Sequence, residues 1–460
     1  MSAPSHPRVT LLEGDIRKIL IALTLPMALG IVFVIAIDVT DTVWVGLLGT
    51  DELAALSFCF PVIAAIMSAS MGLGVGATSA IARAIGAGDE QRVRRLTTHA
   101  LILAFVIVAA LSLLGLATQR WLFTQLGAEG VLLDLVVEYM TIWFVGSAFV
   151  VIPMVGSGAI RATGDMKTPM GIMFTAALAN GLLDPLLMFG LGPIPGFGLR
   201  GAAFASLGAR LLTLVATLWV LGPRLGMLER VWPRRMPAAD MLGSLVASWR
   251  TILSVGLPAT MTNMLGPLAA GVMTSLIAEH GTHAVAGWGV STRIDSLLMI
   301  PIMAMGASLT PFVGQNWAAE RRDRVAQGLV LARRFAIGWG LGAWLVLALL
   351  GRYVGGLFSS DPEVIAVVGL ALLIIPASYA ATGMVMTVSA AFNAIDKALR
   401  STLISALRSL LLAIPLAWIG DSVAGLPGLF GGLVVAAWLT ALIARQMGAS
   451  LFVAPATRET

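Results

Sequence analysis

The chain has 460 residues, of which 58% are hydrophobic and only 12% are charged, and its mean hydropathy is +0.93. Because soluble domains are about 25% charged, this composition excludes an ordinary soluble protein. The net charge of +5 would suit nucleic acid binding, but the placement of the basic residues argues against that class, and the single cysteine, Cys59, excludes an intrachain disulfide and a multi-cysteine metal site.

Apolar segments long enough to cross a membrane follow one another along the whole chain. Runs of 18 or more apolar residues indicate transmembrane helices, because a helix needs about 20 residues to span the hydrocarbon core. We predict twelve spans, at 16–46, 53–85, 93–118, 131–160, 168–190, 198–222, 249–279, 285–317, 325–350, 363–393, 399–420 and 428–453. Since a span in lipid must satisfy its own backbone hydrogen bonds, we expect an all-α polytopic membrane protein embedded in the bilayer.

The basic residues fall mainly in alternate connections between these spans. Arg92, Arg94 and Arg95 lie between the second and third spans, and similar groups precede the first span and follow the fourth, sixth, eighth and tenth. The positive-inside rule places these connections and both termini in the cytoplasm. We therefore expect a multi-pass protein of the cytoplasmic (inner) membrane, whose basic charge reflects topology and not nucleic acid binding.

The second half of the chain repeats the first at one constant offset, which brings position 26 onto position 258. Matching pairs run from Leu25-Pro26 and Leu257-Pro258, through Arg120 and Arg352, to Pro195-Gly196 and Pro427-Gly428. Each copy holds six spans. Because six is even, both copies cross the membrane in the same direction, as in transporters built from parallel repeats.

The repeat predicts two pseudo-symmetric six-helix bundles that face each other around a V-shaped central cleft. The N-terminal lobe is 1–222, the C-terminal lobe is 249–460, and 223–248 is a cytoplasmic linker between them. Such a body suits transport by alternating access, and the sequence has no Walker A motif that would indicate ATP as the energy source. We expect the protein to act as a monomer.

Two acids, Asp41 and Asp184, lie within the predicted spans of the first lobe. Charged side chains inside a membrane are costly, and they are functional by default. Counted from the cytoplasmic end of its span, Asp41 lies roughly 35 Å along the first helix and Asp184 roughly 25 Å along the fifth. Both therefore belong to the outer half of the membrane, where two neighbouring carboxyl groups can bind a proton or Na⁺.

Three uncharged polar residues are predicted to reach the same level of the first lobe. Asn180 lies one turn below Asp184 on the same helix face, and Tyr139 and Ser206 each lie about two turns inside their spans. Each also has a simpler interpretation. Asn180 would suit an interhelical hydrogen bond, Tyr139 an interfacial aromatic side chain, and Ser206 close helix packing.

The repeat provides an internal comparison for these five polar residues. At the offset of the repeat, Asp41, Tyr139, Asn180, Asp184 and Ser206 correspond to Met273, Ala371, Leu412, Leu416 and Trp438. The second lobe thus has apolar residues at all five places. This difference favours a cation site confined to the first lobe over a role in folding.

Other intramembrane residues are weaker candidates. Asp38, about one turn from Asp41, is predicted to relay protons or to line a wet cavity. Intramembrane methionines mostly serve packing, but some can line an adaptable apolar substrate cavity. The candidates for that role are Met27, Met173, Met261 and Met264.

The remaining charged residues within the spans carry no predicted role. Arg293 and Asp295 lie two residues apart and so do not face each other on a helix. Arg210 and Arg408 lie towards the cytoplasmic ends of their spans, where a long side chain reaches water cheaply. No metal site is predicted.

Four stretches resemble the multidrug and toxic compound extrusion (MATE) family. They are DTVWVGLLG at 41–49, RGAAFASLGAR at 200–210, GLPATMTNM at 256–264 and GQNWAAERRDRV at 314–325. The resemblance covers essentially the whole chain, and the acids of the first and fifth spans look most like the bacterial and archaeal DNA-damage-inducible branch. It implies that Asp41, Tyr139, Asn180, Asp184 and Ser206 bind the coupling cation, and it matches Pro26 to a proline that lets the first helix bend.

The resemblance implies a secondary antiporter and not an enzyme. Such a protein exports small amphipathic, often cationic, drugs and dyes in exchange for inward H⁺ or Na⁺, and it needs no cofactor. Two features depart from the family. Acids that other branches carry in the second lobe have no counterpart here, which argues against a second-lobe Na⁺ site, and Asp38 stands where an uncharged polar residue is expected, so its role is not carried over.

Three alternative functions remain open. A flippase or exporter of a lipid-linked intermediate would have similar lobes but a strongly cationic cavity, whereas intramembrane Arg is sparse in this chain. A multi-span membrane acyltransferase would need a His or nucleophile constellation, which four scattered His do not supply. A channel is the third alternative, and duplicated lobes suit it less well than they suit a transporter.

Overall fold

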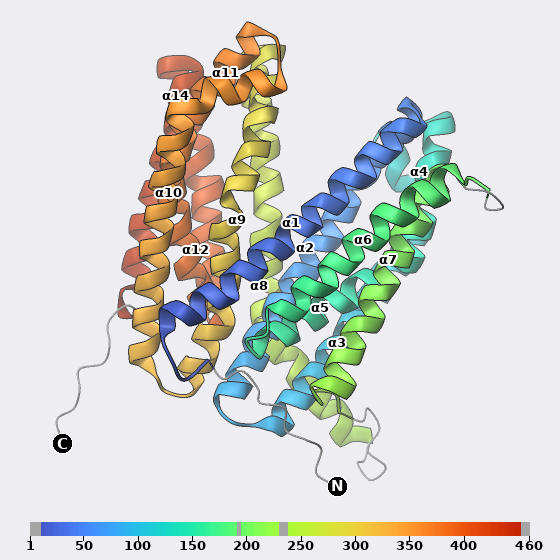
Figure 1. Cartoon of the computed structure of the whole chain (residues 1–460), viewed down its shortest axis with the longest axis vertical. Coiled ribbons are helices and arrows are strands. Elements are labelled where there is room, and N and C mark those ends of the chain that lie inside the picture. Colours follow the sequence, from blue (N-terminus) through green and yellow to red (C-terminus); the bar gives the residue numbers. More distant parts are fainter. Residues whose placement is uncertain (1–10, 191–194, 230–237, 452–460) are drawn as a thin grey trace. The chain divides into compact units, whose positions relative to one another are not determined.

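A computed structural model describes residues 11–190, 195–229 and 238–451. Within these ranges the chain forms helices and no strand (Figure 1). The first half contains α1 (Ile16–Leu48), α2 (Thr50–Gly86), α3 (Glu90–Gln125), α4 (Gly130–Gly146), α5 (Ala148–Ala162), α6 (Lys167–Phe189) and α7 (Leu199–Trp219), which ends in a π-helical turn (Val220–Arg224). The second half contains α8 (Ala238–Ala278), α9 (Thr282–Ala318), α10 (Arg322–Phe358), α11 (Pro362–Ile374), a 3₁₀ turn (Ile375–Ser378), α12 (Tyr379–Ala394), α13 (Ala398–Ala406), a π-helical stretch (Leu407–Leu412) and α14 (Ala413–Met447).

The described helices provide twelve membrane spans. Ten stretches of the described residues are long and apolar enough to cross a membrane, and the pair α4 and α5, bent by 44°, is an eleventh. The last stretch, Ala398–Met447, breaks where Gly425 has a φ of 61°. Because Gly420 packs closely against the backbone of Gly428, the chain reverses at this break and crosses twice. The prediction of an all-α protein with twelve spans in six-helix bundles is confirmed, while the V-shaped cleft stays a prediction.

α8 begins at Ala238, well before the span predicted from 249, and so includes part of the predicted linker. The Ala-, Leu- and Met-rich sequence AADMLGSLVAS favours a helix there. Hydrogen bonds hold this helix to α3, because His99 Nδ1 lies 2.9 Å from Ser248 Oγ and the indole N–H of Trp249 donates to the His99 carbonyl at 3.0 Å.

The chain divides into two compact units by its contacts. Of the described residues, unit 1 contains 29–190, 195–229 and 238–260, and unit 2 contains 11–28 and 261–451. The beginning of α1 therefore belongs to unit 2, and the beginning of α8 belongs to unit 1. The boundaries after Ala28 and Thr260 are related by the offset of the sequence repeat, so this exchange follows the repeat. The lobe boundaries predicted from the spans do not include the exchange, and they stay a prediction.

In unit 1 the beginning of α8 packs on two glycines of α2. Gly72 and Gly76 are spaced one helix turn apart, which lets helix backbones approach closely in a membrane. A Cβ atom at Gly76 would lie 2.4 Å from the Ile252 carbonyl oxygen and 2.9 Å from the Gly256 nitrogen. The hydroxyl of Thr260 also donates to the Ala69 carbonyl at 3.4 Å. This contact completes unit 1 with residues from the second half of the sequence.

In unit 2 the first described residues and the beginning of α1 pack on α9 and α10. α1 begins after Asp15, whose carboxylate accepts the Lys18 backbone N–H at 2.8 Å and so caps the helix. The Leu11 carbonyl accepts from the Asn316 amide at 3.1 Å, and the Arg324 guanidinium donates to the Gly14 carbonyl at 3.0 Å. These bonds fix the entry of the chain into unit 2.

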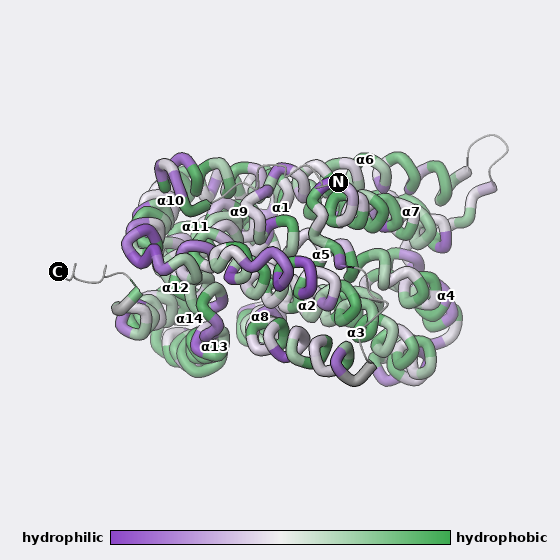
Figure 2. Tube along the Cα trace, turned by 90° about the horizontal axis from the view of Figure 1, so that it is seen from below, coloured by the Kyte–Doolittle hydropathy of each residue, from purple (hydrophilic) through white to green (hydrophobic). Residues whose placement is uncertain are grey.

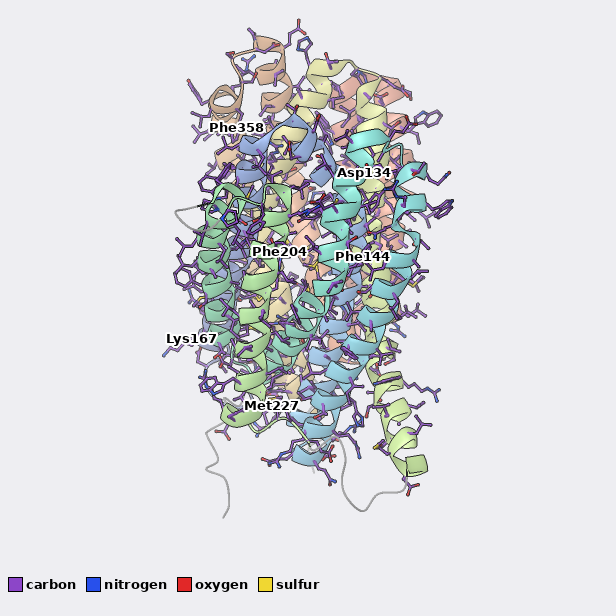
Figure 3. All side chains as sticks on the ribbon, turned by 90° about the vertical axis from the view of Figure 1, so that its right-hand side faces the viewer. Asp134, Phe144, Lys167, Phe204, Met227 and Phe358 are labelled. Carbon is purple, nitrogen blue, oxygen red and sulfur yellow. The ribbon has the colours of Figure 1, made fainter. Side chains whose placement is uncertain are left out.

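The outer surface of the helices is strongly apolar, as a lipid environment requires. Large side chains such as Leu113, Leu349 and Leu357 are largely exposed. Figure 2 shows hydrophobic residues along the helices and hydrophilic residues gathered in connecting segments. In unit 1, Lys167 and Met227 lie near one end of the helices and Asp134 near the other, with Phe144 and Phe204 between them (Figure 3).

Candidate functional site

Unit 1 encloses a cavity of about 600 Å³ between α1, α2, α4, α5 and α7. Most of its wall is apolar, and α2 contributes more lining residues than any other helix, among them Leu53, Leu56, Phe60, Ile63, Met67 and Met71. A size of this order suits a small organic ligand, and such sites combine an apolar wall with a few polar groups. The polar groups here are the ones described next.

Asp41 of α1 and Asp184 of α6 meet beside this cavity. Their carboxyl groups lie within hydrogen-bonding reach of each other. Asp41 lines the cavity and is half-buried, whereas Asp184 lies behind it and has no exposed surface. Two carboxylates this close repel each other unless a proton or another cation lies between them.

Asn180 and Ser206 orient the two acids. The Asn180 amide nitrogen donates to Asp184 Oδ1 at 3.1 Å, and the same side chain reaches Asp41. The Ser206 hydroxyl donates to Asp41 Oδ2 at 3.3 Å. One helix turn separates Asn180 from Asp184 on α6, and this spacing brings their side chains together on one face.

Tyr139 of α4 completes the group. It is buried, it lines the same cavity as Asp41, and it lies within electrostatic range of both acids. The structure thus brings together all five residues that the sequence singled out for a cation site, from four helices of unit 1. Their role in binding a cation stays a prediction.

Three oxygen atoms of this group have room for a further partner. Among the described residues, no donor reaches Asp41 Oδ1, Asp184 Oδ2 or Asn180 Oδ1, although all three atoms are buried. Buried acceptors of this kind are normally satisfied, so a bound proton or cation would complete them. A purely oxygen donor set suits a proton or a hard cation such as Na⁺ and does not suit a soft metal.

Two further charges border the cavity. Asp38, one turn from Asp41 on α1, lines the cavity, in line with one of its two predicted roles. Arg210 of α7 lines it too, and lies within electrostatic range of Asp38 and Asp41. The depth of Arg210, towards the cytoplasmic end of its span, predicts no role for it. A usable signal was its spacing, because Arg210 lies one turn from Ser206 and so shares its helix face.

The four candidate methionines do not line this cavity. Met67 and Met71 of α2 line it instead. Met173 packs on the backbone of α1 at Gly30, Met27 belongs to unit 2 and is half-buried, and Met261 and Met264 are exposed residues of unit 2. This cavity therefore does not test their predicted role in substrate binding, which stays a prediction. Pro26 is buried within α1, which continues through it as a helix.

Comparisons with known proteins place the cavity and the acids in context. The family model MatE matches residues 26–186 and 258–419, two ranges whose first residues are related by the same offset as the repeat. A FAD transporter of Shewanella oneidensis is 36% identical over 425 residues, which is 92% of each chain. The multidrug export protein MepA of Staphylococcus aureus is 23% identical over 443 residues, or 94% of this chain and 93% of MepA.

Solved structures share the fold over nearly the whole chain. An outward-facing multidrug resistance MATE family transporter of the MOP superfamily has a TM-score of 0.88 and 27% identity, covering 98% of this chain and 99% of its own. A MOP superfamily transporter from Pyrococcus furiosus has a TM-score of 0.86 and 27% identity, covering 98% of this chain and 100% of its own.

Proposed function

The chain belongs to the MatE family of membrane transporters, and on that premise we propose that it exports small amphipathic solutes in exchange for inward H⁺ or Na⁺. The observation that carries this proposal is the contact between Asp41 and Asp184 at the wall of the unit 1 cavity. A transporter that couples two fluxes needs an ion site and a solute site that influence each other. Here Asp41 belongs to both.

The proposed cycle uses the charge of the acid pair. When the cavity opens outward, a cation enters between Asp41 and Asp184 and cancels their repulsion, which changes the charge on the cavity wall and favours solute release. When the cavity opens inward, the cation leaves and a solute binds from the cytoplasm. Each charge that moves inward across 100 mV supplies about 2.3 kcal/mol. The protein would work in the cytoplasmic (inner) membrane, as a monomer with both termini in the cytoplasm.

The solute has two candidates, each supported by a different observation. The first candidate is a small amphipathic, often cationic, drug, which suits the apolar wall and the acids of the cavity. The relative MepA is named a multidrug export protein. The second candidate is FAD, because the more similar of the two relatives is the FAD transporter of Shewanella. FAD also has a negatively charged pyrophosphate, for which Arg210 is a partner, and flat rings that suit Phe60 and Trp143 of the cavity wall.

The proposal is tested by transport into inverted membrane vesicles that contain the full chain. We expect uptake of FAD or of a cationic dye to follow an imposed pH gradient or an imposed Na⁺ gradient, with the two gradients applied separately. The response identifies the coupling ion, because only the coupled gradient drives uptake. Uptake that ignores both gradients would exclude the antiporter.

Arg210→Gln distinguishes the two solutes. If FAD is the solute, removal of the cationic partner of its pyrophosphate should weaken uptake by roughly ten- to a hundredfold, since a hydrogen bond to a charged group contributes about 1.5–3 kcal/mol. Uptake of a cationic dye should be unchanged or faster, because the cavity becomes more negative. Arg250→Gln, which removes an exposed charge of α8, serves as the matched control. Equal losses for FAD and dye would contradict the assignment of Arg210 to an anionic solute.

A further inference from the structure

Unit 2 contains an intramembrane acid that the proposed cycle does not use. Asp295 lies on α9, roughly 20 Å along the helix from its first residue. Its neighbours are apolar, because Ile294, Leu298 and Met299 belong to a hydrophobic cluster formed by α9, α10, α11 and α12. An acid in such a place is costly unless it is partnered, and it marks a functional site by default.

The partner of Asp295 is Tyr379, from another helix. The Tyr379 hydroxyl donates to Asp295 Oδ1. Tyr379 is 3% exposed and is itself a member of the apolar cluster. It is the first residue of α12, directly after the 3₁₀ turn at Ile375–Ser378, so the pair ties α9 to a place where the helical path changes.

A tyrosine hydroxyl is a suitable partner for both protonation states of an acid. It donates to a carboxylate, and it can accept from a protonated carboxyl group while donating elsewhere. Asp295 keeps some exposed surface, whereas Tyr379 is buried behind it. The pair therefore combines a partly exposed carboxyl group with a buried hydrogen-bond partner.

No opposite charge in the described part of unit 2 is placed to hold Asp295 permanently ionised. Arg293, on the same helix, is exposed and two residues away, so it points to another side. α12 has no charged residue. The charged or titratable groups of the other packed helices are Arg17 and Lys18 of α1, Arg322, Asp323, Arg324, Arg333, Arg334, Arg352 and Tyr353 of α10 and Glu363 of α11. The influences that act on Asp295 are burial and the Tyr379 hydroxyl.

The sequence repeat indicates that the pair is not needed to fold a unit. At the offset of the repeat, Asp295 corresponds to Ile63 and Tyr379 to Ser147. Ile63 is an apolar residue of the unit 1 cavity, and Ser147 hydrogen-bonds to Ser112 at 2.6 Å. Unit 1 thus lacks the acid and the tyrosine and forms its bundle without them.

We propose that Asp295 and Tyr379 form a proton-binding site in unit 2, separate from the Asp41 site in unit 1. The Asp295 carboxylate takes a proton from water to become a carboxyl group, and releases it to water in the reverse step. Tyr379 is a positioning residue, which keeps one hydrogen bond to the carboxyl group in both states. The contribution of this proton to export rests on the proposed function, but its binding does not.

Infrared spectroscopy of the purified full-length protein tests the site directly. The carbonyl-stretch band of protonated carboxyl groups is followed while pH is varied around neutrality, in the wild type and in Asp295→Asn, Tyr379→Phe, Asp41→Asn and Asp51→Asn. We expect Asp295→Asn to lose one titrating component that Asp41→Asn and Asp51→Asn retain. Asp51 is an exposed acid at the start of α2 and serves as the control. Tyr379→Phe should retain the component with a changed frequency and midpoint, because the carboxyl group loses a hydrogen bond.

Each outcome bears on the proposal. Identical pH titrations of the wild type and Asp295→Asn would overturn it. So would a titrating band whose frequency and midpoint are unchanged in Tyr379→Phe. Asn keeps an oxygen that accepts from Tyr379, so Asp295→Asn should fold. If it does not fold, the presence or absence of a band-frequency change in Tyr379→Phe decides whether the proposal stands. Vesicle transport that responds to neither the pH gradient nor the Na⁺ gradient, together with an intact Asp295 component, would contradict the proposed function and leave this site standing.

Discussion

Asp41→Asn is expected to abolish coupled export while the protein still folds and reaches the membrane. Asparagine has nearly the same size as aspartate, and its side-chain oxygen can still accept the Ser206 hydroxyl that now donates to Asp41 Oδ2. It carries no negative charge, so the repulsion with Asp184 disappears and the variant has no reason to bind a cation. Gradient-driven uptake into inverted vesicles should fall to the level of vesicles that lack the protein.

The control for this variant is Asp51→Asn, which removes an exposed acid of unit 1 outside the cavity and should leave uptake unchanged. Membrane content and a monodisperse elution profile must match the wild type in both variants. Normal coupled uptake by Asp41→Asn would exclude Asp41 as the ion-binding residue and remove the observation on which the proposed function depends.

Gly76→Leu is expected to destabilise the protein more than any of the other substitutions. A Cβ atom at this position would lie 2.4 Å from the Ile252 carbonyl oxygen and 3.0 Å from the Gly256 Cα, and neither backbone atom can move aside as a flexible side chain can. Overpacking costs about 1–3 kcal/mol and sometimes more, and here it would also separate α8 from α2. We expect little folded protein and a clearly lower melting temperature in detergent.

Gly338→Leu is the matched control, because Gly338 is an exposed glycine within α10 and a Cβ atom there would meet nothing within 4 Å. It introduces the same side chain into a helix without a clash, so its melting temperature should stay close to that of the wild type. Equal stability of the two variants would show that the contact between α2 and α8 does not hold unit 1 together.

The sequence predicted the residues of the unit 1 site because their signals are local or repeated. Acids in apolar runs are visible without a structure, and the spacing of Asn180 and Asp184 places both on one helix face. The repeat then favoured a site over a role in folding, since the second half has apolar residues at all five places. Depth along a helix was a sufficient guide to their convergence because the spans are long and run side by side within the unit.

Contacts between helices explain what the sequence could not predict. The charged neighbour of Asp295 in the sequence, Arg293, does not face it on the helix, whereas its partner, Tyr379, lies on a helix much further along the chain. Arg210 was set aside by depth alone, although the cavity reaches it. Neither a pairing between distant helices nor the extent of a cavity follows from periodicity.

The exchange of half-helices between the two units has a consequence for how such a chain could arise. Unit 1 is completed by the beginning of α8, and unit 2 by the beginning of α1, at boundaries that the repeat relates to each other. A shorter ancestor with one copy of the repeat would have supplied that half-helix to a neighbour and received one in return, as domain-swapped dimers do. Gene duplication would then have preserved an obligate dimer inside one polypeptide, and freed each half to acquire its own acids.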